Sequence, residues 1–258
     1  MPKPTEDEAE KVEETEELTG QMSFFDHLEE LRRRLLNSLI AVGVAFALCY
    51  YFVDPIYDVF YQLMLRSGAK LNATGITSGF TILLKMAFLA SLFLAAPFIL
   101  AQVWLFISPG LYKKERRYAL PFVAFATVLF VAGGVFGYMV ALPFGMAFLI
   151  QMTKDHGIET LLNVEEAFNF VFYIELGLGV IFEIPAIIFL LSRLGLVTGS
   201  FLLKNLKYAV LICFVAAALI TPTGDIVNMM IIGLPMIGLY LLGIVIAYIF
   251  GKKRTKEA

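Results

Sequence analysis

The chain has 258 residues, of which 59% are hydrophobic and 16% are charged, and its mean hydropathy is +0.80. This composition excludes a soluble globular domain, which carries more charge, and predicts an all-α integral membrane protein. The formal net charge of −2 indicates little about partners, because acids gather near the start of the chain while most cations lie further along.

The first segment, residues 1–22, is rich in Glu, and we expect it to be a disordered acidic tail. It lacks the basic and then apolar order of a cleavable signal peptide, so the first span is expected to direct insertion. Ser23-Phe24-Phe25-Asp26 has the form of a capping box and predicts the start of an amphipathic helix. The side of that helix expected to face water or headgroups carries Asp26, Glu29, Glu30 and Arg33.

Six apolar runs predict six transmembrane helices within one membrane domain over residues 23–251. The expected spans are 35–53, 80–107, 118–142, 168–191, 208–220 and 226–250, and a basic tail, 252–258, follows. About 20 apolar residues are needed to cross a hydrocarbon core of about 30 Å. The fifth run, with 13 residues, is therefore short for a crossing.

Two connections are expected on the far side of the membrane. Residues 54–79 mix aromatic and polar side chains, which favours an interfacial helix. Residues 143–167 are predicted to form a second loop, which carries His156. Just before it, Gly133 and Gly137 form a G-x-x-x-G pattern that permits close helix approach, and packing within the chain is favoured over a dimer interface.

The distribution of Lys and Arg predicts the orientation. With six crossings, fourteen cations beyond the acidic tail fall on one side of the membrane. The other side receives Arg66, Lys70, Lys85 and Lys154. By the positive-inside rule, both termini are expected in the cytoplasm. A re-entrant fifth run would place the terminal basic cluster outside, so six spans are preferred.

The sequence contains no recognisable catalytic constellation, and we expect no enzyme activity. The two histidines, His27 and His156, are predicted on opposite sides of the membrane, and neither a hydrolase motif nor a phosphate-binding loop is found. Cys49 and Cys213 lie in apolar runs without neighbouring ligands. We therefore predict no metal, no cofactor and no nucleic-acid partner.

Two carboxylates on the cytoplasmic side are candidate binding residues. Glu30 and Glu115 would each be able to accept a bidentate pair of hydrogen bonds from a guanidinium group. The alternative is local pairing, because Glu30 is four residues from Arg34 and Glu115 has cations on both sides. The residues alone do not decide between these two interpretations.

An acid within a span is a different case, because a charge is costly there and usually faces a partner, a cavity or a proton path. Glu183 lies near the middle of the fourth span, and Pro185 removes a backbone hydrogen bond beside it. The alternative is a protonated acid that is hydrogen-bonded within the bundle. Gln102 is a weaker case of the same kind, and Glu175 has no assigned partner.

These motifs resemble the TatC family, the multi-spanning subunit of the twin-arginine protein translocase. The resemblance covers residues 22–253, nearly the whole chain outside the acidic tail. It rests on the runs His27 to Leu35, Ala96-Pro97, Gln102 to Arg117, Phe182-Glu183-Ile184-Pro185, and Thr221-Pro222 with Asp225.

The resemblance implies a receptor in the prokaryotic cytoplasmic (inner) membrane that binds signal peptides with paired arginines on folded proteins. Export in the family is driven by the proton-motive force, and membrane lipid and further copies of the chain are expected neighbours. The implied signal-peptide site consists of Glu30, Glu115, Phe106 and Arg32. An intramembrane polar site with Glu183 and Gln102 would meet single-span subunits of the TatA/TatB type, and Pro222 and Asp225 would form an extracytoplasmic turn.

Two features depart from the family pattern. The family often has a Gln shortly after the Asp of the last turn, where this chain has Asn228 and Met229, and Glu175 has no counterpart that we can match.

The alternative function is a proton-coupled transporter of a small solute that uses Glu183. The lack of an internal repeat argues against it. A scaffold without a ligand would leave the acids freely replaceable.

Overall fold

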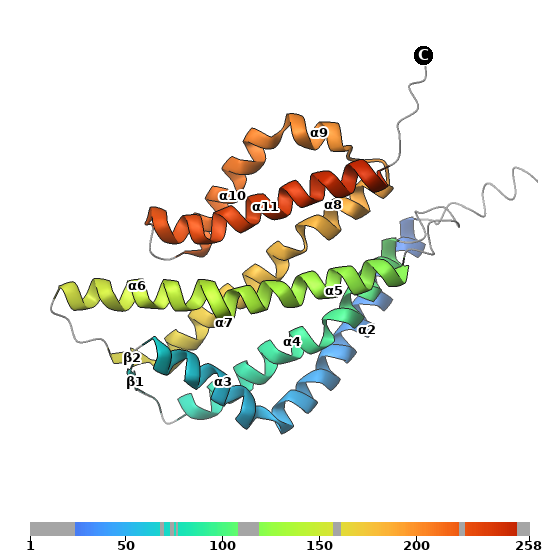
Figure 1. Cartoon of the computed structure of the whole chain (residues 1–258). Helices are drawn as coiled ribbons and strands as arrows, with labels where there is room; N and C mark the ends of the chain where they lie inside the picture. Colours follow the sequence, from blue (N-terminus) through green and yellow to red (C-terminus); the bar gives the residue numbers. More distant parts are fainter. Residues whose placement is uncertain are drawn as a thin grey trace, which may run out of the picture.

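The computed structural model describes residues 24–67, 70–72, 75, 77–107, 119–156, 161–221 and 225–251. Over these ranges the protein is built from helices and one pair of short strands (Figure 1), so the predicted all-α class is confirmed. The elements are α2 (Phe24–Tyr51), α3 (Val53–Arg66), β1 (Lys70–Asn72), α4 (Ser78–Ile107), α5 (Ala119–Phe136), the π-helical η3 (Gly137–Ala141), α6 (Leu142–Asp155), β2 (Leu161–Asn163), α7 (Val164–Phe182), α8 (Ile184–Arg193), α9 (Gly199–Lys204), α10 (Leu206–Ile220) and α11 (Ile226–Phe250).

Among the described residues, five helical stretches are long and apolar enough to cross a membrane. They are Phe25–Tyr51, Ser78–Ile107, Ala119–Asp155, Val164–Arg193 and Ile226–Phe250. The sixth, α10, has 15 residues and measures about 22 Å at 1.5 Å per residue. The start of α2 and the end of α11 lie toward the same end of the bundle (Figure 1), as an even number of crossings requires. The protein is a six-span integral membrane protein.

The third span is longer than predicted. The expectation of a loop from Pro143 is wrong for its first part, because α5, η3 and α6 form one continuous 37-residue helical rod that ends at Asp155. Pro143 lies in the first turn of α6, directly after the π-helical turn. A proline inside a helix removes one hydrogen bond to the preceding turn, and the π-helical turn directly before Pro143 lies where that bond is lost. At about 55 Å, the rod exceeds the hydrocarbon thickness.

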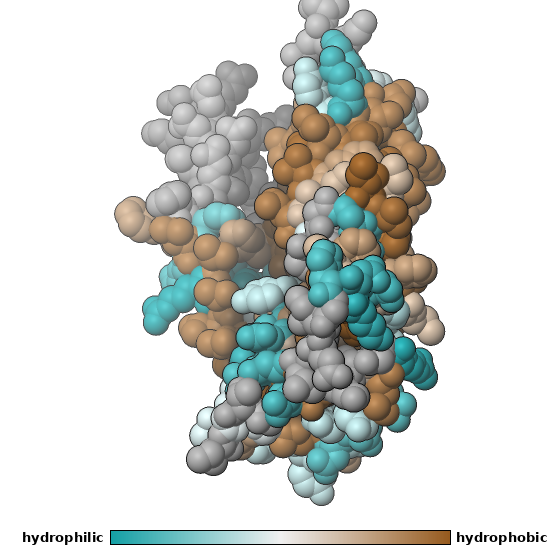
Figure 2. Space-filling view, turned by 90° about the vertical axis from the view of Figure 1, so that its left-hand side faces the viewer, coloured by the Kyte–Doolittle hydropathy of each residue, from teal (hydrophilic) through white to brown (hydrophobic). Residues whose placement is uncertain are grey.

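At the far end of this rod, the connection that follows α3 pairs with the connection that follows α6. Helix α3 occupies the region where an interfacial helix was expected. Strands β1 and β2 pair in parallel, with Lys70 opposite Leu161 and Asn72 opposite Asn163, and three residues each made them too short to detect in the sequence. Figure 2 looks onto this end of the bundle, where hydrophilic residues gather on the end face and hydrophobic residues cover much of the flank.

The fourth span is broken at Glu183. Helix α7 begins with Asn163 as its N-cap, whose side chain accepts a hydrogen bond from the N–H of Glu165 at 2.9 Å. It ends at Phe182, and α8 starts at Ile184. Pro185 lies in the first turn of α8, where it has no N–H to donate. The break therefore follows from the proline that the sequence places beside the acid.

The core lies between the rod, α7 and their neighbours. Its largest fully buried side chains include Phe168, Met64, Met86 and Leu142. A second cluster near the opposite end packs Trp104 against Phe122, with ring centroids 4.7 Å apart. Helix α2 packs mainly against α4 and leaves much of its apolar surface exposed, as a lipid-facing helix does.

Candidate functional site

A polar cluster of Glu30, Arg34 and Gln102 lies between the first half of α2 and the last part of α4. The Arg34 guanidinium donates from Nη2 to Glu30 Oε1 at 3.1 Å and from Nη1 to Gln102 Oε1 at 3.4 Å. The local pairing of Glu30 with Arg34 is therefore confirmed. The second carboxylate oxygen of Glu30, Oε2, is buried and has no hydrogen-bond partner among the described residues. Within the described part of the chain, the cluster therefore has one acceptor without a donor.

The burial of Glu30 differs from the sequence-based expectation. Asp26, Glu29 and Arg33 are exposed as the helical wheel predicted, but the side chain of Glu30 is only 8% exposed. The wheel treats α2 in isolation, whereas α4 packs along it and covers the face that carries Glu30 and Arg34. A buried carboxylate requires partners for both oxygens, because an unpaired buried acceptor is destabilising.

The other predicted binding residues surround this cluster. Phe106, near the end of α4, stacks on His27 of α2 with ring centroids 4.4 Å apart. Arg32 is exposed and lines a hollow of about 570 Å³ along α2 together with Glu29 and Glu30. A hollow with charges of both signs on its wall is suited to a polar ligand rather than to a purely apolar one.

Two of the predicted site residues lie outside the described residues, namely Glu115 and Pro222. The end of α4 and the start of α5, between which Glu115 lies in the sequence, are toward the end of the bundle at which α2 begins (Figure 1). At the other turn, Asp225 caps α11. Its carboxylate accepts from the backbone N–H of Asn228 at 2.9 Å and from the Asn228 side chain at 2.8 Å.

Glu183 and Gln102 do not form one polar site through the contacts seen. Gln102 pairs with Arg34, as described above. Glu183 is 8% exposed, and its Oε1 has no hydrogen-bond partner within the described part of the chain. Val180 and Ile187, which share its face of the helix by spacing, are 55% and 48% exposed. Gly179 and Ala186, at the other two adjacent helical positions, are buried. Glu183 thus lies at the border between the packed face of the fourth span and an exposed apolar surface.

Glu175, on α7, is the second buried acid of the fourth span, and sequence reasoning gave it no role. It is 7% exposed and lies against Gly134 and Gly137. The glycine pattern therefore serves packing within the chain, as predicted. Across the described residues, no group of three His, Cys, Asp or Glu side chains is placed to hold a metal ion.

Sequence reasoning missed three parts of the site. These are the link from Arg34 to Gln102, the stacking of His27 on Phe106, and the burial of Glu175 against glycines. For the burial of Glu175, the available signals were the small residues Gly134 and Gly137 in one span and an acid without an assigned partner in the next. The other two join residues far apart in the chain and had no local signal.

The fold and the site define a polytopic membrane protein with a polar cluster at one end of the bundle and buried acids within its spans. Residues 26–235 match the family model described as Sec-independent protein translocase protein (TatC). The chain belongs to the TatC family and is a component of the twin-arginine protein translocase. This membership favours protein export over the transport of a small solute.

The similarity to individual relatives extends over the whole membrane domain. A TatC protein of Koribacter versatilis is 41% identical over 263 residues, which span 100% of this chain and 96% of that protein. TatCy of Bacillus subtilis is 34% identical, over 93% of this chain and 94% of that protein. The crystal structure of a twin arginine translocase receptor, TatC, in DDM has a TM-score of 0.76 at 30% identity, over 86% of this chain and 99% of that one.

Proposed function

We propose that this protein is the receptor that binds signal peptides with two adjacent arginines at the cytoplasmic face of a prokaryotic cytoplasmic membrane. The observation that carries the proposal is the buried Oε2 of Glu30, which has no hydrogen-bond partner among the described residues. Arg34 holds the other oxygen, so the carboxylate is fixed in position and still has an acceptor for a second guanidinium. Binding of an arginine would remove the penalty of a buried, unpaired oxygen.

The remaining residues of the proposed site have distinct roles. Glu115, on the connection between α4 and α5, would receive the second arginine. Phe106 offers a ring on which a guanidinium can stack. Arg32 and the other cations nearby would discourage unselective binding of basic peptides, because only a ligand that pairs with both acids offsets the repulsion.

A cross-linking experiment tests this assignment. A signal peptide with an Arg-Arg pair and a photoreactive group is compared with the same peptide carrying Lys-Lys, on membranes with the wild-type chain or with Glu30→Gln, Glu115→Ala or both. We expect about a tenfold loss of Arg-Arg cross-linking for each single variant, the size of one charge-assisted hydrogen bond. The matched control is Asp58→Asn, an exposed acid on α3 that does not line the hollow beside Glu30. Unchanged cross-linking in the double variant would refute both assignments.

We further propose that Glu183 is the docking point for the transmembrane helix of single-span TatA- or TatB-like subunits. Glu183 borders an exposed apolar surface that includes Val180 and Ile187. A helix that packs there with one polar side chain would partner the unpaired Oε1. Export would then be driven by the proton-motive force, without a nucleotide, and copies of this chain would assemble in a larger complex.

The proposed orientation places both termini in the cytoplasm, because the positive-inside rule assigns the larger number of cations to that side. Single-cysteine labelling tests it. A cysteine introduced at exposed Gln151, in a chain without Cys49 and Cys213, is expected to react with a membrane-impermeant maleimide added outside intact cells. A cysteine in the C-terminal tail is expected to react only after lysis, and the reverse result would contradict the orientation.

A further inference from the structure

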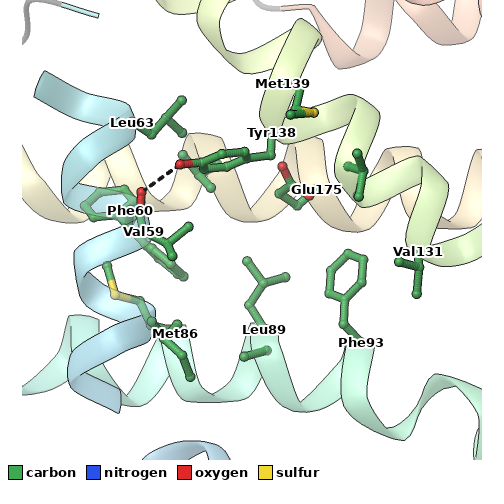
Figure 3. A pocket seen from close by; sticks show the side chains of 16 residues that line it. Val59, Phe60, Leu63, Met86, Leu89, Phe93, Val131, Tyr138, Met139 and Glu175 are labelled. Carbon is green, nitrogen blue, oxygen red and sulfur yellow. Dashed lines mark hydrogen bonds between the residues drawn. The ribbon is translucent and has the colours of Figure 1, made fainter. Parts of the chain in front are cut away.

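Glu175 lines a cavity that the proposed receptor function does not use. The cavity has a volume of about 470 Å³ and lies between α3, α4, the region around η3, and α7. Figure 3 shows Glu175 reaching in from α7 toward Tyr138 and Met139, above Phe93 and Leu89 of α4. Glu175 as a whole residue is 7% exposed, and its carboxylate oxygen Oε1 has no hydrogen-bond partner among the described residues.

The space around the carboxyl group depends on two glycines. A Cβ at Gly137 would lie 2.9 Å from Glu175 Oε1, and a Cβ at Gly134 would lie 3.2 Å from Oε2 and 2.5 Å from the Phe93 ring. These distances are shorter than ordinary van der Waals contacts. Any larger side chain at these positions would therefore displace the carboxyl group, and the two glycines keep it beside the cavity.

The wall of the cavity is apolar apart from this group. Among its described lining residues, Glu175 is the only one with a charged side chain, and the Tyr138 hydroxyl already donates to the carbonyl of Val59 at 3.2 Å. The rim residues Val59 and Met139 are 53% and 68% exposed. In a membrane protein such a flank faces lipid, so a ligand would enter from the bilayer.

This combination of features selects a class of ligand. Binding pockets of 300–1,000 Å³ with apolar walls and few polar groups hold small, mainly apolar molecules, which the polar groups orient. A purely hydrocarbon ligand would leave Glu175 Oε1 unpaired, and a strongly polar ligand would gain nothing from the wall. The ligand that satisfies both has an apolar chain and a single hydrogen-bond-donating head.

We propose that this cavity is a binding site for a single-chain amphiphile dissolved in the membrane, whose hydroxyl or amine head donates to Glu175 and whose chain lies along α3 and α4. The site is independent of the signal-peptide site, because no residue of the Glu30 cluster lines it. The occupant belongs to the lipid phase rather than to another protein chain.

Photolabelling in lipid nanodiscs tests the proposal. The probe is a long-chain alcohol with a diazirine midway along its chain, and the comparison probe is the same molecule with a methyl group in place of the hydroxyl. Labelled peptides are identified by mass spectrometry. We expect the alcohol to label the peptides that carry Phe93 and Met139 roughly fivefold more than the methyl probe, as one added hydrogen bond predicts. Competition with unlabelled long-chain alcohol and amine separates the two head groups.

Variants decide the role of the carboxyl group. Glu175→Leu replaces the carboxylate that accepts the hydrogen bond by an apolar side chain of similar volume, and it is expected to abolish the difference in labelling between the two probes. Gly137→Ala is expected to reduce that difference. Gly177→Ala is the matched control, since a Cβ there meets nothing within 4 Å. If Gly137→Ala does not fold, Glu175→Leu alone decides. Equal labelling by both probes, labelling unchanged in Glu175→Leu, or loss of labelling whenever single-span subunits are added would overturn the proposal.

Discussion

Arg34 binds one oxygen of Glu30 at 3.1 Å and leaves the other buried without a partner among the described residues. The pair is half of a bidentate geometry, and the same guanidinium extends to Gln102 on the neighbouring helix. The first and second spans are thereby joined by a polar contact at the end of the bundle where a ligand is proposed to bind. Substitution of Arg34 should therefore affect both stability and ligand binding.

The first prediction concerns this pair. Arg34→Met should lower the free energy of unfolding by about 1–3 kcal/mol, because Glu30 would be left buried with neither oxygen paired. Glu30→Gln combined with Arg34→Met should cost less than the sum of the single changes, since the double variant buries no charge. Detergent-titration unfolding of the purified protein measures all three variants. Simple additivity would contradict a direct interaction.

The second prediction concerns the approach of α5 to α7. A Cβ at Gly133 would lie 2.6 Å from the backbone carbonyl of Leu178, which cannot move aside as a side chain can. Gly133→Ala should therefore destabilise the bundle by about 1–3 kcal/mol. Gly177→Ala on α7, in open space, should be neutral or slightly stabilising because alanine favours helix. Thermal unfolding midpoints in detergent provide the comparison, and equal midpoints would argue against close packing.

The architecture was largely predictable from the sequence, because apolar length and charge distribution decide how many helices cross a bilayer. Errors arose where a neighbouring helix changes the environment of a residue. The helical wheel of α2 predicted that Glu30 is exposed, but α4 covers it. Pro143 was interpreted as the end of a helix, although the helix continues past it after a π-helical turn. The contact between Arg34 and Gln102 spans 68 positions and has no local pattern. Glu115 lies outside the described residues, so its role stays a prediction.

The third prediction concerns the turn before the last span. Asp225 caps α11 through the N–H of Asn228 and also binds the Asn228 side chain, which is 6% exposed. Asp225→Ala should cost about 1–2 kcal/mol, because the cap and the partner of a buried amide are lost together. Asp225→Asn keeps an acceptor for the backbone N–H and should cost less. Unfolding midpoints that do not differ between the two variants would contradict this capping role.

The last prediction separates the two buried acids of the fourth span, Glu175 on α7 and Glu183 between α7 and α8. Glu183 borders the exposed surface of Val180 and Ile187, whereas Glu175 faces the cavity lined by α3 and α4. A partner helix docked over Glu183 would supply a donor to its unpaired Oε1, and removal of that acceptor should weaken association severalfold. Affinity purification of the translocase from membranes, with the single-span subunits quantified by immunoblot, measures the effect.

Glu183→Ala should lose most of the co-purified subunits, and Val180→Trp should also lose them, because a bulky side chain at the same surface would block docking. Glu175→Ala, which also removes a buried acid from this span, should retain them. If Glu183→Ala co-purifies its subunits normally, or if both alanine variants lose them equally, a specific contact at Glu183 is refuted.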